Sequence, residues 1–160
     1  MTVGITYRLS DKLDLEEVKN LLLEAELPVD DLSAGKITFV LALNESGKLI
    51  GCIGLEQYER DGLLRSFAVD SAYRGKGIGH ELLSRLLSIS RQSGVSNLHL
   101  LTTTAEKFFA RAGFLNIIRD DAPASIKGTV EFSSLCPSSS TYMVKRDILE
   151  EDHQKIKQKV

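Results

Sequence analysis

Residues 69–80 read Val-Asp-Ser-Ala-Tyr-Arg-Gly-Lys-Gly-Ile-Gly-His, with three glycines at alternate positions. The apolar run Leu63–Val69 before them predicts a strand, and the apolar spacing over Glu81–Arg91 predicts a helix. Glycines let a backbone approach a ligand closely, and the N–H groups of a first helical turn attract anions. Arg74 and Lys76 add positive charge at the same place. We therefore interpret this stretch as a cradle for a pyrophosphate.

The spacing of the glycines excludes two nucleotide-binding patterns. A dinucleotide-binding G-x-G-x-x-G would need glycine where His80 stands, and a Walker loop would need Ser or Thr after Lys76, where Gly77 stands. The pattern that remains is Arg74-x-x-Gly77-x-Gly79. The alternative is a glycine-rich turn without a ligand, which three glycines and two cations at one helix start disfavour.

Composition restricts the class of protein. The chain has 160 residues, 42% apolar and 26% charged, as is typical of one soluble globular domain. Its net charge of −2 gives no general basis for binding nucleic acids or membranes. We find no run near the ~20 apolar residues of a membrane span, no signal-peptide pattern and no metal-ligand spacing of Cys and His. Two cysteines are too few for a disulfide scaffold, so we expect a reducing cytoplasm.

Hydrophobic periodicity and turn residues predict an alternation of strands and helices. The expected strands are 4–9, 37–43, 49–58, 63–69, 97–102, 114–118 and 141–144. The expected helices are one capped by Asp11 or Asp14 and running to Ala25, 81–91, one capped by Thr103 or Thr104 and ending at Gly113, and 122–132, with a short helix or turn over 28–35. Arg60–Gly62 is expected to be a turn.

Several of these features resemble the GNAT superfamily of N-acetyltransferases. The strand end Phe67-Ala68-Val69-Asp70 followed by Arg74-x-x-Gly77-x-Gly79 is similar to its acetyl-CoA motif, and residues 105–114 are similar to its A-x-x-F-Y-x-x-x-G-F segment. The resemblance covers about residues 4–146. It implies an α+β fold with a central mixed, mostly antiparallel sheet, flanking helices and splayed parallel fourth and fifth strands. Residues 1–146 would be a single domain and residues 147–160 a charged tail.

Three stretches further resemble the small acetyltransferases found with arsenic-resistance genes. They are Leu64-Arg65-Ser66, Leu101-Thr102-Thr103-Thr104-Ala105-Glu106 and Leu135-Cys136-Pro137-x-Ser139. This resemblance implies an amino-acid-like acceptor with an anionic tail, such as an organoarsenical or a phosphinic amino acid.

The superfamily resemblance also implies where acetyl-CoA binds. Its pantetheine amides would pair with the strand edge at 67–69, its pyrophosphate would meet the N–H groups of 76–80, and a backbone N–H of a bulged strand would serve as oxyanion donor. The candidate CoA-binding residues are Phe67, Ala68, Val69, Arg74, Gly75, Lys76, Gly77, Ile78, Gly79, His80, Thr102 and Phe108. Leu82, Leu86 and the Phe108/Phe109 pair also read as core positions.

The acid and the base of the reaction are less defined. The family often supplies an acid from the Tyr of its F-Y pair, and here Phe109 stands in that place. Tyr142, Tyr58 and Cys136 are candidate substitutes, or the thiolate leaves unaided. Glu56 is the first candidate base, because a short turn would place it roughly across from Ser66. The alternative is an exposed strand carboxylate paired with Arg65.

The candidate acceptor-binding residues are Arg65, Ser66, Thr103 and Cys136. The planar fork of Arg65 suits a carboxylate, phosphinate or arsonate, and the alternative is a surface cation beside Glu56 or Asp61. One of Thr102–Thr104 is expected to cap the next helix and another to contact ligand. Cys136 faces the acceptor or is a small buried hydrophobe.

The sequence thus predicts a cytoplasmic N-acetyltransferase that moves acetyl from acetyl-CoA to a primary amine of a small molecule, without a metal, nucleic acid or membrane. The alternatives are a non-catalytic acyl-CoA sensor, favoured by Phe109, and an acetyltransferase of protein N-termini or lysines. A homodimer stays open.

Overall fold

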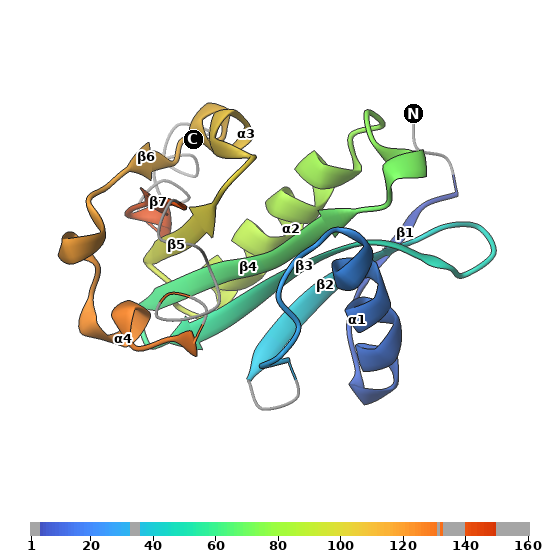
Figure 1. Ribbon diagram of the computed structural model, residues 1–160, viewed down its shortest axis with the longest axis horizontal. Coiled ribbons are helices and arrows are strands. Elements are labelled where there is room, and N and C mark those ends of the chain that lie inside the picture. Colours follow the sequence, from blue (N-terminus) through green and yellow to red (C-terminus); the bar gives the residue numbers. More distant parts are fainter. Residues whose placement is uncertain (1–3, 33–35, 131, 133–139, 150–160) are drawn as a thin grey trace, which may run out of the picture. The chain divides into compact units, whose positions relative to one another are not determined.

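The computed structural model describes residues 4–32, 36–130, 132 and 140–149. Its strands are hydrogen-bonded in the order β1-β2-β3-β4-β5-β7-β6, and β4 and β5 run parallel (Figure 1). The pairs β1–β2, β2–β3, β5–β7 and β6–β7 are antiparallel. The predicted α+β fold with a mixed, mostly antiparallel sheet is confirmed.

The bounds of the elements follow the chain. The strands are β1 Thr6–Leu9, β2 Ile37–Leu43, β3 Leu49–Tyr58, β4 Asp61–Val69, β5 Asn97–Thr102, β6 Leu115–Asn116 and β7 Thr141–Lys145. The α-helices are α1 Leu15–Glu24, α2 Ile78–Gln92, α3 Glu106–Arg111 and α4 Ala124–Lys127, and short 3-10 turns span Lys12–Asp14, Ser71–Tyr73 and Arg119–Asp121.

The chain divides into two compact units. The first comprises residues 1–56 and 64–88, and the second comprises residues 57–63 and 89–160. β4 therefore contributes its first three residues to the second unit, where Asp61–Leu63 pair with Asn97–His99 of β5. The rest of β4 belongs to the first unit.

In the first unit, α1 and α2 lie on opposite faces of the strands (Figure 1). The apolar stripe of α1 packs on β2 and β3 because Val18, Leu21 and Leu22 recur at helical spacing. α2 comes close to β3 at Gly51, where an added Cβ would lie 3.1 Å from the side chain of Leu82. The buried members of the cluster under α1 are Val18, Leu21, Leu22, Leu32, Phe39, Leu41, Leu49, Cys52 and Ala68.

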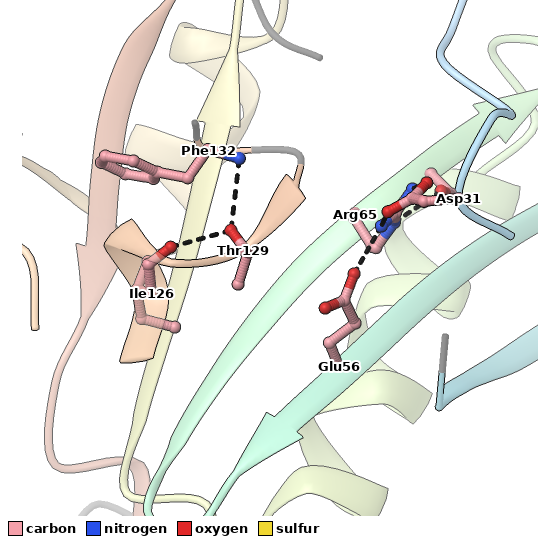
Figure 2. Close-up of polar contacts among 7 residues, drawn as sticks. Asp31, Glu56, Arg65, Ile126, Thr129 and Phe132 are labelled. Atoms are coloured by element: carbon pink, nitrogen blue, oxygen red, sulfur yellow. Dashed lines mark hydrogen bonds and ion pairs between the residues drawn. The ribbon is translucent and has the colours of Figure 1, made fainter. Parts of the chain in front are cut away.

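The second unit has its own apolar cluster beneath α4. Thr129 anchors the chain after α4, because its Oγ1 donates to the carbonyl of Ile126 at 2.8 Å and accepts from the N–H of Phe132 at 3.2 Å (Figure 2). The buried members are Leu63, Ala122, Ile126, Phe132, Tyr142 and Val144. Leu82 and Leu86 of α2 and Phe109 of α3 are also buried, as predicted for core positions.

The bounds of β2, β3 and β5 match the prediction, and Asp11 caps the turn that leads into α1, its side chain accepting from the N–H of Leu13. Several other bounds were wrong, among them the following three. The expected helix over 122–132 is only α4, the expected strand over 114–118 is only β6, and β4 already begins at Asp61. The turn before β4 is shorter because Glu59 adopts a left-handed conformation, with φ of 58°. Pairing with β5 then includes Asp61 and Gly62.

Candidate active site

The predicted cradle joins β4 to α2 in the first unit. The Asp70 carboxylate accepts the N–H of Ala72 at 2.9 Å, and the N–H of Asp70 donates to the carbonyl of Ile50 at 2.8 Å. The first bond stabilises the turn itself, and the second connects it to β3. Gly75 and Gly77 have φ of 79° and 82°, a region that side chains disfavour, and nothing lies within 4 Å of a Cβ built on either.

The helix starts earlier than its apolar spacing predicts. α2 begins at Ile78, so Gly79 and His80 lie in its first turn, whose N–H groups have no earlier helical carbonyl to bind. Arg74 and Lys76 are exposed beside this turn. An open backbone, N–H donors and two cations together suit a pyrophosphate. The role of these residues as CoA ligands stays a prediction.

β4 carries a backbone irregularity in its middle. Ser66 is buried and has φ of 54°, which is unusual for a residue other than glycine within a strand. The thiol of Cys52 on β3 donates to the carbonyl of Ser66 at 3.3 Å. An added Cβ on Gly54 of β3 would lie 3.2 Å from the carbonyl of Arg65. Such a distortion re-aims backbone groups and side chains, as bulges beside active sites do.

Arg65, the residue before this irregularity, is the centre of a buried ionic cluster (Figure 2). Its Nη1 donates to carboxylates of both Asp31 and Glu56, its Nη2 donates to Asp31 Oδ1 at 2.6 Å, and its Nε donates to Ser66 Oγ at 3.1 Å. The Asp31 carboxylate thus meets the guanidinium in a two-pronged geometry. We call Asp31, Glu56 and Arg65 the ionic cluster.

The ionic cluster corrects two alternatives from the sequence, a surface cation at Arg65 and an exposed carboxylate at Glu56. Arg65 is 2% exposed and is no surface cation, and Glu56 is 8% exposed and is no exposed carboxylate, although its pairing with Arg65 is confirmed. Asp31 was missed altogether. It lies in the segment between α1 and β2, 34 positions before Arg65, and no local pattern signals the pairing.

In the second unit, Tyr142 takes part in a chain of hydrogen bonds. Its hydroxyl lies 2.7 Å from His99 Nδ1, and His99 Nε2 lies 2.7 Å from Asp61 Oδ1. Because a carboxylate only accepts, we assign the proton of a neutral His99 to Nε2, and the Tyr142 hydroxyl then donates to Nδ1. Burial raises the pKa of Tyr142 to about 12. That shift makes its phenol a weaker acid, and its catalytic role stays a prediction.

Phe67, Ala68 and Val69 end β4 in the first unit, whereas Thr102, Thr103 and Phe108 belong to the second unit. The Thr102 hydroxyl accepts the N–H of Ala105 at 2.9 Å, so the predicted capping by Thr103 or Thr104 is wrong: both are exposed, and Ala105 is the cap position of α3. Phe108 is half-buried and packs edge-on against buried Phe109. Cys136 lies outside the described residues.

We expect His99 to make the stability of the fold depend on pH. Burial lowers its pKa from the ordinary 6.5, against the raising effect of Asp61 and together with the lowering effect of Arg146. Below pH 6.5 the unfolded chain then binds a proton that the folded chain resists, so the free energy of unfolding falls as pH falls. Urea unfolding between pH 7.5 and pH 5.5, both ~1 unit from that value, should show this slope.

The matched variant is His99→Gln, which keeps hydrogen-bonding groups but does not titrate. It should be less stable by about 1–2 kcal/mol at pH 7.5, because two buried hydrogen bonds are altered, and its slope over this range should be shallower. Equal slopes in both proteins would contradict the neutral, buried state of His99.

Across residues 4–32, 36–130, 132 and 140–149, no group of three or more His, Cys, Asp or Glu side chains is placed to hold a metal ion. Over the same ranges, every helix is too short or too polar to cross a membrane.

Comparison with known sequences identifies a family and several relatives of this chain. Residues 35–115 match the model of the acetyltransferase (GNAT) domain. The amino-acid acetyltransferase of Mycobacterium tuberculosis is 38% identical over 93 residues, which are 58% of this chain and 50% of that protein. That of Ralstonia nicotianae is 30% identical over 83 residues, 51% of this chain and 18% of that protein. This chain therefore spans half of one relative and less of the other.

Solved structures agree on the fold. N-acetylglutamate synthase from Neisseria gonorrhoeae, complexed with coenzyme A and N-acetyl-glutamate, has a TM-score of 0.76 at 22% identity, over 89% of this chain and 35% of that chain. Rv2747 from M. tuberculosis, in complex with CoA and NLQ, has a TM-score of 0.74 at 25% identity, over 88% of this chain and 98% of that chain. The family model matches half of the residues, and the sheet is mixed with parallel β4 and β5, as the family resemblance implied. The chain therefore belongs to the GNAT family of acetyltransferases.

Proposed function

We propose that this chain transfers acetyl from acetyl-CoA to the amine of a free amino acid or a close analogue. The observation that carries the proposal is that three features lie along β4 and at its end. Within the first unit, one strand presents a buried guanidinium at Arg65, a distorted backbone at Ser66 and, at its end, the glycine cradle. A carboxylate receptor and an anion cradle on one strand suit an acceptor and a donor that react together.

The proposed reaction needs few groups from the protein. The acceptor nitrogen attacks the thioester carbon, the C–N bond forms, and the C–S bond breaks as the electron pair leaves with the CoA sulfur. Glu56 takes the proton that the ammonium loses before attack, and water takes the second proton that the nitrogen loses once the C–N bond has formed. A backbone N–H of the distorted strand stabilises the oxyanion. A thiolate with a pKa near ~8.5 leaves without an acid. Phe109, which stands where the family often has tyrosine, has no proton to donate to the thiolate.

The acceptor class rests on the ionic cluster and on the relatives. Relatives named amino-acid acetyltransferases support a carboxylate-bearing acceptor for Arg65. An arsenical or phosphinic amino acid would offer Arg65 a similar oxyanion. The support for such an acceptor is limited to the three stretches that resemble acetyltransferases found with arsenic-resistance genes. We place the protein in the cytoplasm as part of this proposal, which free Cys52 favours.

Release of the CoA thiol with a panel of amines tests the proposal. The panel comprises the twenty amino acids, their amides, a phosphinic and an arsenical amino acid, and a peptide with a free N-terminus. We expect turnover with amino acids and a kcat/KM about 10- to 100-fold lower for the matching amide, because the amide loses a charged contact with Arg65. Tight binding of acetyl-CoA without turnover on any amine would instead indicate a sensor.

A further inference from the structure

The guanidinium of Arg65 is already bound by a carboxylate, that of Asp31 in the segment between α1 and β2. Asp31 follows α1 in the chain, and its side chain is 13% exposed while that of Arg65 is fully buried. Both oxygens of Asp31 engage the fork, Oδ2 at Nη1 and Oδ1 at Nη2. A free amino acid would present its carboxylate to an arginine in the same two-pronged way.

An acceptor that binds Arg65, as our proposed function requires, must therefore compete with the carboxylate of Asp31. Removing Asp31 without replacement would leave a buried charge with fewer partners, which is strongly unfavourable. Exchange of one carboxylate for another avoids this loss, because the paired contacts are made again. Asp31, whose side chain is more exposed than that of Arg65, would move toward solvent, where water hydrates its charge.

We propose that Asp31 is an internal stand-in for the carboxylate of the acceptor, holding Arg65 in place until an amino acid displaces it. The inference rests on the proposed function and adds a determinant of specificity to it. An amine without a carboxylate cannot replace the charged contacts that Arg65 makes with Asp31, so it binds weakly even where its shape fits. An amino acid that displaces Asp31 brings its ammonium toward Glu56, which shares Nη1 of Arg65 with Asp31.

The stand-in competes with the acceptor, and its removal should favour binding. The apparent affinity of a ligand falls with the fraction of protein in which its site is available. In Asp31→Asn the neutral amide holds Arg65 more weakly than a carboxylate does. We expect KM for the amino acid that is best in the panel to fall about tenfold. KM for acetyl-CoA should stay unchanged, and KM for the amide should fall less than KM for the amino acid, because the amide brings no charge to the guanidinium that Asp31→Asn leaves short of an anion.

The adjacent Asp30→Asn is the matched control, because Asp30 is exposed and the substitution is chemically the same. It should behave as the parent protein does. A rise in the KM of the amino acid in Asp31→Asn, or equal changes for the amino acid and its amide, would show that Asp31 has only a structural role and would overturn the inference. Turnover on no amine at all would instead refute the proposed function.

A second measurement needs neither turnover nor a variant. Hydrogen exchange of the amides in residues 27–32 is followed in the parent protein with and without sodium propionate, which supplies a carboxylate and no amine. Displacement of Asp31 should release this segment and speed its exchange, whereas sodium chloride at equal ionic strength should not. Unchanged exchange at saturating propionate would also overturn the inference.

Discussion

Gly77→Asp is expected to abolish the binding of acetyl-CoA while the fold is kept. Gly77 has φ of 82°, and a Cβ built on it meets nothing within 4 Å, so the new side chain has space. Asp tolerates the left-handed conformation better than most residues, at a cost of roughly 1–2 kcal/mol. Its carboxylate would stand just before the first turn of α2, where the cradle is expected to meet the pyrophosphate.

The size of the effect follows from Coulomb's law. Two unit charges about 4 Å apart repel each other by about 4 kcal/mol at the effective dielectric constant of a protein surface. A pyrophosphate carries more than one charge, so affinity should fall by about a thousandfold or more. Calorimetric titration with acetyl-CoA measures it directly, and thermal melting reports whether the fold survives.

Gly77→Asn separates the charge from the strain. Asn has nearly the same shape as Asp and the same tolerance of positive φ, but it adds no charge. It should keep most of the affinity and melt at about the temperature of the Asp variant. Similar affinities in the Asp and Asn variants would show that no anion of the ligand lies at this turn.

The backbone geometry of the turn between β4 and α2 could be predicted from the sequence because its determinants are local. Two glycines with positive φ, two cations and the start of a helix lie within a few consecutive residues, and each residue type reports the backbone geometry that it permits. The bounds of β2, β3 and β5 were predictable for a similar reason. Their β-branched and apolar runs are continuous and end at turn residues.

The contacts of the other candidate residues, in either unit, are not local, and this is why the sequence did not reveal them. Asp31 and Arg65 are 34 positions apart, and His99 and Tyr142 are 43 apart. Which carboxylate reaches a given guanidinium depends on how α1 packs and where the following segment runs, and neither is encoded in spacing. Burial was equally hidden, since charged residues such as Glu56 and Arg65 are almost always exposed unless they are paired.

Glu56→Gln is expected to lower kcat by about a hundredfold or more near neutral pH, the usual contribution of a general base. The fold should tolerate this change. Gln Oε1 can still accept the hydrogen bond from Arg65, and Asp31 keeps the guanidinium paired with an anion. The loss should therefore fall on kcat, with KM for acetyl-CoA unchanged. Glu59→Gln is the matched control, because Glu59 is exposed in the turn between β3 and β4.

The dependence on pH distinguishes a base from a residue that only positions the acceptor. As pH rises toward the pKa of the acceptor amine, more of the amine is already deprotonated and needs no base. The deficit of Glu56→Gln should therefore be largest at low pH and shrink as pH rises. A pH profile parallel to that of the parent would remove Glu56 as the base. If KM for the amino acid rises while kcat is kept, Glu56 binds the ammonium, and water takes the proton.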